Sequence, residues 1–372
     1  MTGTAGVWLI ALLAQGPSSS HGVLDVHARA TLAADVLPRR DVSELRPEVG
    51  VEVTVRPSTR LTMRFDGVVE GLVADRSGRV TDATLLVRDA YVETHAAAVD
   101  VRAGYGRLVW GRLDEIAPTD VINPIDAAKF LFDGRSEARL PVTFVRGRVS
   151  VSERLRVEGV IVPRFRRGAF DRLDEPSSPF NLAADAVLAA GVAAAPGRLQ
   201  LEPGRGWRDA SGGARVEATL GRVDASASVY RGFDGLGPIG FQASIDSVSA
   251  QIVGQVVEFH PRFTMVGGDF ETVAGPWAFR GEVAGFVDRS FLAAGAAPGM
   301  PLALVRGQSF DAGVGFDRRV RAWRVFGSTI VHRSWAKEAP SVSHTNVDIV
   351  ASLERPFHGD RYVVRGFAVA SS

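Results

Sequence analysis

Charged and amide side chains gather in one proline-interrupted stretch of the sequence, residues 107–139. Carboxylates that face guanidinium groups across a narrow opening create a transverse electric field, and such a field selects polar solutes. The residue types and their spacing therefore favour a constriction and selectivity site over a catalytic one. The candidate residues are Arg107, Arg112, Asp114, Asp120, Asn123, Asp126, Arg135 and Arg139.

The same stretch also has a structural interpretation. Pro118 and Pro124 restrict the residues before them and force turns, so the nearby acids can cap those turns and pair with the arginines. The two interpretations are compatible, because a constriction loop must first be rigid. Both predict that residues 112–139 form a long loop folded toward the interior of the scaffold.

The scaffold is predicted to be all-β, because alternating apolar and polar residues dominate the chain from Leu24 onward. In residues 24–32, leucine, valine and alanine occupy every even position and polar residues every odd one. A helix is expected only within the alanine-rich residues 181–195. The alternation recurs in residues 49–56, 214–220, 310–317 and 347–354.

Short links between these strands alternate with long ones, which predicts an up-and-down antiparallel barrel with tight turns at one end. The count is roughly fifteen strands of about ten residues, near the ~9–11 residues that cross a bilayer. Residues 247–273 are counted as one long strand. Bacterial single-chain barrels have even strand numbers, so about 16 strands are expected. Either one or more closing strands lie beyond Ser372, or the count of fifteen has missed one strand.

The size of the barrel decides which way the apolar face points. A barrel this large has a lumen too wide for apolar side chains to fill, so they are expected to face lipid. The predicted fold is therefore a transmembrane β-barrel, a single domain over residues 23–372, with Arg102, Arg156 and Glu158 facing the lumen. A soluble two-sheet or repeat protein is the alternative, since its strands also have one dry and one wet face.

The composition excludes several other classes. Lys and Arg total 43 and Asp and Glu total 42, so a net charge of +1 provides no field for nucleic acid. Cysteine is absent and the seven histidines show no ligand spacing, so no metal or other cofactor is expected. Residues 1–22 predict a signal peptide, because an apolar run at 7–14 precedes small residues; a buried N-terminal strand or helix is the alternative.

Enzyme signatures are missing from the sequence. It contains no GxSxG elbow, no HExxH helix and no phosphate-binding glycine loop. A hydrolase needs a positioned serine, histidine and acid, and any selection such as Ser152, Asp246 and His260 is arbitrary. The protein is therefore predicted not to be an enzyme, with an outer-membrane hydrolase as a minor alternative.

The motif around the loop carries a resemblance to a known family. It runs through Gly106, Arg107, Trp110, Gly111, Asp114, Pro118, Asp120, Val121, Asn123, Pro124, Asp126, Ala138, Arg139 and Pro141. This pattern resembles proteobacterial outer-membrane proteins similar to porin-like barrels of the DUF1302 type and, more distantly, to alginate-export barrels. The resemblance implies an outer-membrane barrel with the motif loop after an early strand. One departure is the C-terminus, FAVASS, where such barrels end on Phe or Tyr.

The predicted function is a porin-like channel of a Gram-negative outer membrane that passes or exports polar solutes through a charged lumen. Its expected partners are outer-membrane lipid and an unknown small solute or polymer. A non-conducting scaffold, or a subunit of an envelope complex, is the alternative function. The sequence leaves substrate, direction of transport and oligomeric state open.

Overall fold

Strands make up most of the described chain. The computed structural model describes residues 7–15, 19–21, 23–37, 42–75, 79–127, 129, 135–169, 193–201, 203–204, 206–245, 252–293, 304–357 and 362–372. The strands are β1 (Val7–Gln15), β2 (Ser19–His21), β3 (Leu24–Leu37), β4 (Val42–Ser58), β5 (Leu61–Asp75), β6 (Arg79–Ala96), β7 (Val99–Gly106), β8 (Val142–Ser152), β9 (Leu155–Val162), β10 (Ala193–Leu201), β11 (Ser211–Leu220), β12 (Val223–Phe233), β13 (Ile239–Ile245), β14 (Ile252–Phe259), β15 (Arg262–Ala274), β16 (Trp277–Leu292), β17 (Leu304–Val320), β18 (Trp323–Trp335), β19 (His344–Phe357) and β20 (Tyr362–Ser371).

Helical segments are short. Those given bounds within the described residues are α2 (Arg135–Ala138), η1 (Trp207–Asp209) and η2 (Pro340–Val342). Among the described residues, no helix is long and apolar enough to cross a membrane.

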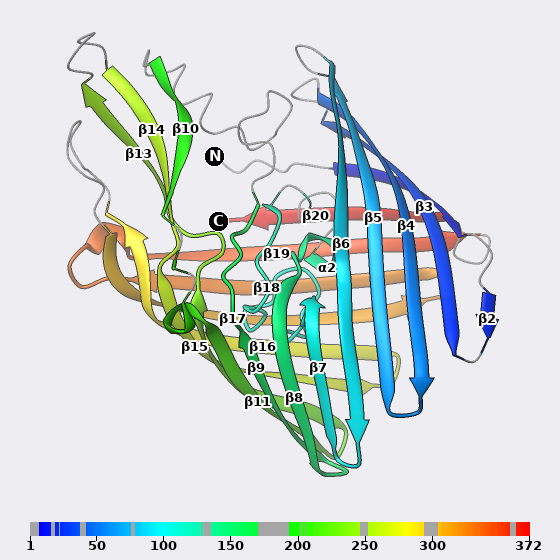
Figure 1. Cartoon of the computed structure of the whole chain (residues 1–372). Coiled ribbons are helices and arrows are strands. Elements are labelled where there is room, and N and C mark those ends of the chain that lie inside the picture. Colours follow the sequence, from blue (N-terminus) through cyan, green and yellow to red (C-terminus); the bar gives the residue numbers. More distant parts are fainter. Residues whose placement is uncertain are drawn as a thin grey trace.

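Sixteen strands pair side by side into a closed antiparallel barrel (Figure 1). Each strand from β3 to β9 pairs with the next, and the series continues through β11, β12 and β15 to β20. β1 lies between β20 and β3, with Val7 opposite Phe367 and Trp8 opposite Val36. The sheet therefore closes on itself, and the all-β up-and-down prediction is confirmed.

Tight turns join the strands at one end of the barrel. Links of two residues follow β4, β6, β8, β11, β15 and β17. In two of these turns Gly221 and Gly275 have φ of 68° and 60°, a left-handed conformation that suits two-residue hairpins. At the opposite, long-loop end the chain leaves β7 and returns to β8 after residues 107–141.

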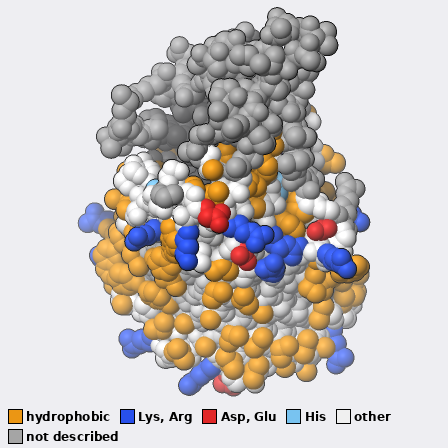
Figure 2. Space-filling view, turned by 90° about the vertical axis from the view of Figure 1, so that its left-hand side faces the viewer, with side chains coloured by type: hydrophobic (Ala, Val, Ile, Leu, Met, Phe, Trp, Pro, Cys, Tyr) orange, Lys and Arg blue, Asp and Glu red, His pale blue; other side chains and the backbone are white. Residues whose placement is uncertain are grey.

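The apolar side chains of the alternating pattern point outward. Figure 2 shows hydrophobic side chains in a broad belt on the visible face, with basic side chains near its upper and lower edges. Exposed members on the strands include Val49, Val51, Phe65, Val69, Val145, Ile161, Val216, Val229, Val266, Val283, Phe310, Val314 and Ile349. This is the orientation that the sequence predicts for a wide barrel.

The interior differs from the predicted polar lumen. On β8, β9, β12, β15 and β16, inward residues nearer the long-loop end are apolar and buried. They form one cluster of Val142, Phe144, Val160, Val162, Tyr230, Phe263, Met265, Ala284 and Phe286. Apolar side chains can point into the lumen at this height because the loop after β7 covers them with its own apolar side chains.

Two strand assignments from the sequence need correction. Residues 247–273 are not one strand, because the chain breaks at His260 and Pro261 between β14 and β15. β14 leaves the barrel and pairs with β13 and β10 in a separate three-stranded sheet that projects beyond it (Figure 1). The up-and-down order is kept because this sheet stands outside the ring.

The sixteenth barrel strand is β1, formed by residues that the sequence assigns to a signal peptide. The other fifteen correspond to the strands counted from the sequence. Cleavage of residues 1–22 stays a prediction. Of the expected helix, residues 181–192 lie outside the described residues, and residues 193–195 begin strand β10.

Candidate functional site

The loop after β7 lies inside the barrel against the inward faces of the strands that follow it. Leu108, Trp110 and Ile122 belong to the buried apolar cluster of the wall, and Leu113 packs with Ile330 of β18 in a second cluster. Trp110 is only 1% exposed, and its ring meets Tyr230 edge-on with the centroids 6.1 Å apart. Apolar burial of this kind, at about 25 cal/mol per Å², is what stabilises the loop in the interior.

Bare backbone on the wall makes room for the largest loop side chains. A methyl group added at Gly213 of β11 stands 2.9 Å from the Trp110 ring, and one at Gly313 of β17 stands 2.7 Å from Leu113. Carbon atoms pack at about 3.5–4.0 Å, so the docked loop leaves no space for a side chain at Gly313, whereas at Gly213 the Val229 carbonyl oxygen, 2.4 Å from the added methyl group, excludes one as well. The loop side chains therefore pack directly against the backbone at these two glycines.

A single carboxylate on β16 anchors the backbone of the loop. Glu282 is 2% exposed and accepts hydrogen bonds from the N–H groups of Leu113 at 2.5 Å and Thr119 at 3.0 Å. It also accepts from the N–H of Arg112 and, at 2.9 Å, from the Thr119 hydroxyl. Without this carboxylate the loop would bury unsatisfied donors, each costing about 1–3 kcal/mol.

The Arg112 side chain reaches from the loop to β15. Its Nε donates to Asp269 at 2.5 Å and its terminal nitrogen to Glu271 at 3.2 Å, while Asp269 also accepts from Arg215 at 3.0 Å. Burial lowers the pKa of Arg112, but the hydrogen bonds and charges of Asp269 and Glu271 together raise it more, so its pKa lies above the ordinary value. Arg112 is therefore a charged tie between loop and wall.

The predicted lumen-facing residues lie on inward positions of their strands. Glu158, 4% exposed, accepts from the Trp110 indole at 2.7 Å and from Arg148 at 2.8 Å. Arg102 donates to Glu93 of β6 at 2.7 Å. Arg156 is two residues before Glu158 on β9 and so points to the same face of the sheet, but it lies near the tight turn and is exposed. Two of the three are thus held in charged contacts of the interior.

Two predicted residues hold the loop to itself. Asp120 accepts from Nε of Arg139 at 2.6 Å. Asn123 accepts from the Leu108 N–H at 2.8 Å and donates to the Leu140 carbonyl at 2.7 Å, so it ties the outgoing and returning arms of the loop together. Both contacts are those expected from the structural interpretation of the sequence.

The remaining loop arginines and Asp126 lie near the long-loop end. Arg107 is 3.8 Å from Asp89 and 3.9 Å from Glu137. Asp126 accepts from the Lys129 N–H at 3.0 Å. Arg135 is the first residue of α2, and its side chain lies outside the described part of the chain.

Asp114 is the loop acid that faces arginines of the wall. Its carboxylate lies 3.3 Å from Arg280 of β16 and 3.6 Å from Arg324 of β18. Burial raises the pKa of Asp114 above its ordinary value, although both arginines lower it. This is the geometry predicted for acids that face strand-borne arginines.

The eight candidates therefore do not form one ring of opposed charges. Most of their charge is used within the loop or between loop and wall, because a charge in a narrow interior needs a close partner. Sequence reasoning missed the wall residues that do the holding, chiefly Glu282, Asp269, Glu271 and Arg280. No local signal marks them, since acids and arginines at inward strand positions occur all along the chain.

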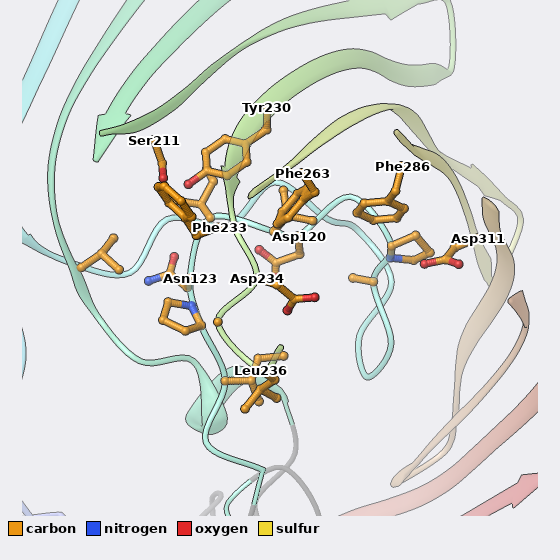
Figure 3. Close-up of a pocket in the computed structure, with 18 of the residues that line it drawn as sticks. Asp120, Asn123, Ser211, Tyr230, Phe233, Asp234, Leu236, Phe263, Phe286 and Asp311 are labelled. Carbon is orange, nitrogen blue, oxygen red and sulfur yellow. The ribbon is translucent and has the colours of Figure 1, made fainter. Parts of the chain in front are cut away.

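A cavity of about 340 Å³ lies between the loop and the wall at the long-loop end (Figure 3). Figure 3 shows the rings of Phe233, Tyr230, Phe263 and Phe286 in a row along the wall, with Asp234 projecting between them and Leu236. Asp120 and Asn123 contribute to its lining from the loop. The cavity is therefore part apolar and part charged.

The residues considered for a hydrolase do not converge. Ser152 lies at the tight-turn end of β8, whereas His260 precedes β15 at the long-loop end. Asp246 lies outside the described residues. Within the described ranges no group of three or more His, Cys, Asp or Glu side chains could hold a metal ion. The predictions of no enzyme activity and no cofactor stay predictions.

Comparison with solved structures gives distant likenesses to outer-membrane proteins. An outer-membrane OmpT of Vibrio cholerae is 9% identical, with a TM-score of 0.45 and coverage of 100% of this chain and 96% of that one. The anion-selective porin from Comamonas acidovorans is 9% identical, with a TM-score of 0.45 and coverage of 100% and 99%. OprB of Pseudomonas putida is 7% identical, with a TM-score of 0.44 and coverage of 100% and 94%.

Sequence comparison is more specific. No curated protein matches the chain significantly. The family described as protein of unknown function, DUF1302, matches residues 57–337. This range includes the whole loop after β7 and all strands from β5 to β18. These residues are about three quarters of the 372-residue chain, and the chain therefore belongs to the DUF1302 family.

Proposed function

We propose that this protein is an integral β-barrel of a bacterial outer membrane and passes solutes through a lumen narrowed by the loop after β7. The observation that carries the proposal is the combination of a closed sixteen-stranded ring, an outward apolar belt and a loop docked inside. A soluble protein would expose this belt to water, where large apolar patches are avoided. Lipid is the environment that suits it.

Aromatic residues at the tight turns support the same orientation. Trp277 and Trp323 directly follow two of these turns. Their rings lie within 4.8 Å and 5.3 Å of the guanidinium groups of Arg318 and Arg355. Tryptophan and arginine together are enriched where a membrane meets water.

The docked loop, rather than the diameter of the barrel, is expected to limit which solutes pass. It fills the side of the lumen formed by β8–β18, and its described contacts with β5 and β6 are ion pairs and a hydrogen bond from the Arg107 N–H to Asp89. Passage is therefore expected along the side that is lined by charge. The same packing favours the second candidate function, a scaffold whose lumen is closed.

Planar-bilayer recording separates the two functions. The channel proposal predicts small, discrete conductance steps for the purified protein and larger steps after deletion of residues 113–137. Heat-modifiable migration on a gel must first show that both proteins are folded. No conductance from either folded protein would overturn the channel function and leave the scaffold.

Membrane location has its own test. We expect the protein in outer-membrane fractions and in detergent extracts, and recovery as a soluble protein would contradict the proposal. N-terminal sequencing of the same material decides the role of residues 7–15. A start after residue 22 agrees with the signal peptide, whereas an intact start leaves these residues to form β1 between β20 and β3.

A further inference from the structure

A group of arginines lies on the outer face of the barrel, at the long-loop end of β12 and β15. Arg231 is exposed and comes two residues after Val229, so it points to the same outward face of the sheet. Thr264 of β15 is its partner in the strand register, and Arg262, two residues before Thr264, therefore points outward as well. Diagonal neighbours of this kind have Cα atoms about 7–8 Å apart, so the two long side chains can reach one ligand.

These arginines are held in place but are not neutralised. Arg231 donates to the Thr264 hydroxyl at 2.9 Å. Arg262 donates to the carbonyl of Arg208 at 2.6 Å, and its guanidinium lies 4.3 Å from the centroid of the Phe233 ring. Within the described residues the three arginines form no ion pair. Each guanidinium has several further N–H donors, which stay available to a partner outside the chain.

The immediate surroundings leave this basic patch of Arg208, Arg231 and Arg262 uncovered. On β11 the residue opposite Arg231 is Gly212, which has no side chain to lie over the guanidinium. Two acids are close in the chain or the sheet, Asp209 after Arg208 and Asp288 after the last register partner of β15 on β16. Neither forms an ion pair in the described part of the chain. The patch therefore keeps a net positive charge.

The patch borders the outward apolar belt. Val229 and Val266, which pair with each other, are exposed on the same face and lie two residues closer to the tight-turn end. Trp207, next to Arg208, is 85% exposed. Arginine and exposed tryptophan beside an apolar surface are typical of the level at which lipid headgroups lie. A solute in the lumen does not meet this outer face, so the partner that fits it is a lipid.

We propose that this patch binds the phosphate group of an anionic membrane lipid, with Arg231 and Arg262 on the phosphate and the acyl chains along Val229 and Val266. Guanidinium groups match phosphate oxygens in geometry and charge, and the hydrogen bonds between them are charge-assisted. The proposal rests on the membrane location in the proposed function and is independent of conductance.

Native mass spectrometry of the full chain in a neutral detergent measures this binding. The probes are dioleoyl phosphatidate, whose headgroup is anionic, and dioleoyl phosphatidylcholine, whose phosphate is balanced by choline. Their acyl chains are identical, so a difference between them reports the headgroup. We expect phosphatidate to bind more tightly, and inorganic phosphate added as a competitor should not displace it, because a free anion lacks the acyl chains.

Substitutions locate the site. Arg231→Gln and Arg262→Gln should each weaken binding of phosphatidate about fivefold and leave phosphatidylcholine unchanged. Arg262→Lys keeps the charge without the planar fork and should lie between wild type and Arg262→Gln. Arg333→Gln is the matched control, because Arg333 is also exposed at the long-loop end, on β18, but its register partners are Phe310 and Thr345. Heat-modifiable migration on a gel must show that every variant is folded.

Equal binding of the two lipids, or the same loss in Arg333→Gln as in Arg231→Gln, would overturn the assignment. Displacement of phosphatidate by inorganic phosphate would show a site for free anions and overturn the lipid as its occupant. Recovery of the protein in outer membranes without selective lipid binding defeats only this inference. Selective binding without conductance defeats only the channel function, and recovery as a soluble protein defeats the membrane location itself.

Discussion

Two walls of the same barrel treat their inward faces in different ways. The loop-packed wall, β8–β16 of the ring, buries apolar side chains under the loop and buries two acids that hold it, Asp269 at 5% and Glu282 at 2% exposed. The open wall, β3–β6, carries a ladder of ion pairs instead. Arg64 and Glu52 are 3.0 Å apart there, with side chains 33% and 25% exposed.

The difference shows what the alternating pattern leaves undecided. Both walls place apolar residues outward. Their inward residues differ because one wall packs against the loop and the other lines the rest of the lumen. Among the described contacts, the loop meets the open wall through ion pairs, such as Glu137 with Arg88 and Lys129 with Glu70, and through the Arg107 N–H, which donates to Asp89 of β6 at 3.3 Å. The Arg88–Glu137 pair, whose acid is 43% exposed, contributes little stability, whereas the more buried Lys129–Glu70 pair and the buried acids with several donors are costlier to break.

The largest expected effect comes from removing the apolar anchor of the loop. Trp110→Ala leaves a cavity and removes the indole donor from Glu158, which keeps only Arg148, and it should weaken loop docking by about 3–5 kcal/mol. Trypsin should then cut within residues 113–137 of folded protein. Trp207→Ala, which removes an exposed ring, is the control. Equal protease resistance of both variants would contradict the anchoring role.

The next effect compares one acid from each wall. Glu282→Gln removes the charge that satisfies four loop donors and should cost about 2–3 kcal/mol of loop docking. Glu52→Gln loses one half-exposed pair with Arg64 and should cost below about 1 kcal/mol. Denaturant titration of protease resistance measures both. Comparable costs would remove the distinction between the walls.

A smaller effect is expected from adding a side chain at a wall glycine against which the loop packs. Gly313→Val places methyl groups where Leu113 packs and should cost about 1–3 kcal/mol of loop docking. Gly159→Val is the control, because nothing lies within 4 Å of a methyl group at that position. The same protease assay applies, and an undisturbed loop in Gly313→Val would show that Leu113 can repack.

The smallest effect concerns pH. Because burial raises the pKa of Asp114, its protonation favours the docked loop: this contribution is complete below the ordinary value of 3.8 and is lost as pH rises through the raised value. Asp114→Asn should make docking less dependent on pH in this range. The side chain is 38% exposed, so the change should be slight. Weaker docking of Asp114→Asn near neutral pH would instead show that Arg280 and Arg324 dominate.

Parts of the site were predictable because they are local. Asn123 and Asp120 lie between two prolines or beside one, and a polar side chain in such a turn bonds to nearby chain. Their partners Leu108, Leu140 and Arg139 lie fewer than twenty residues away. The wall partners were not predictable, since Glu282 lies 170 residues from Arg112 and Asp269 lies 157.

By itself the sequence determined the strands, the tight turns, the outward apolar face and the place of the loop, because each follows from residues close together in the chain. Only the tertiary structure decided that β1 closes the ring, that β14 leaves it, and that the loop packs on one wall. These outcomes depend on which strands and loops meet in space, and a period of two is the same whichever strand or loop lies opposite.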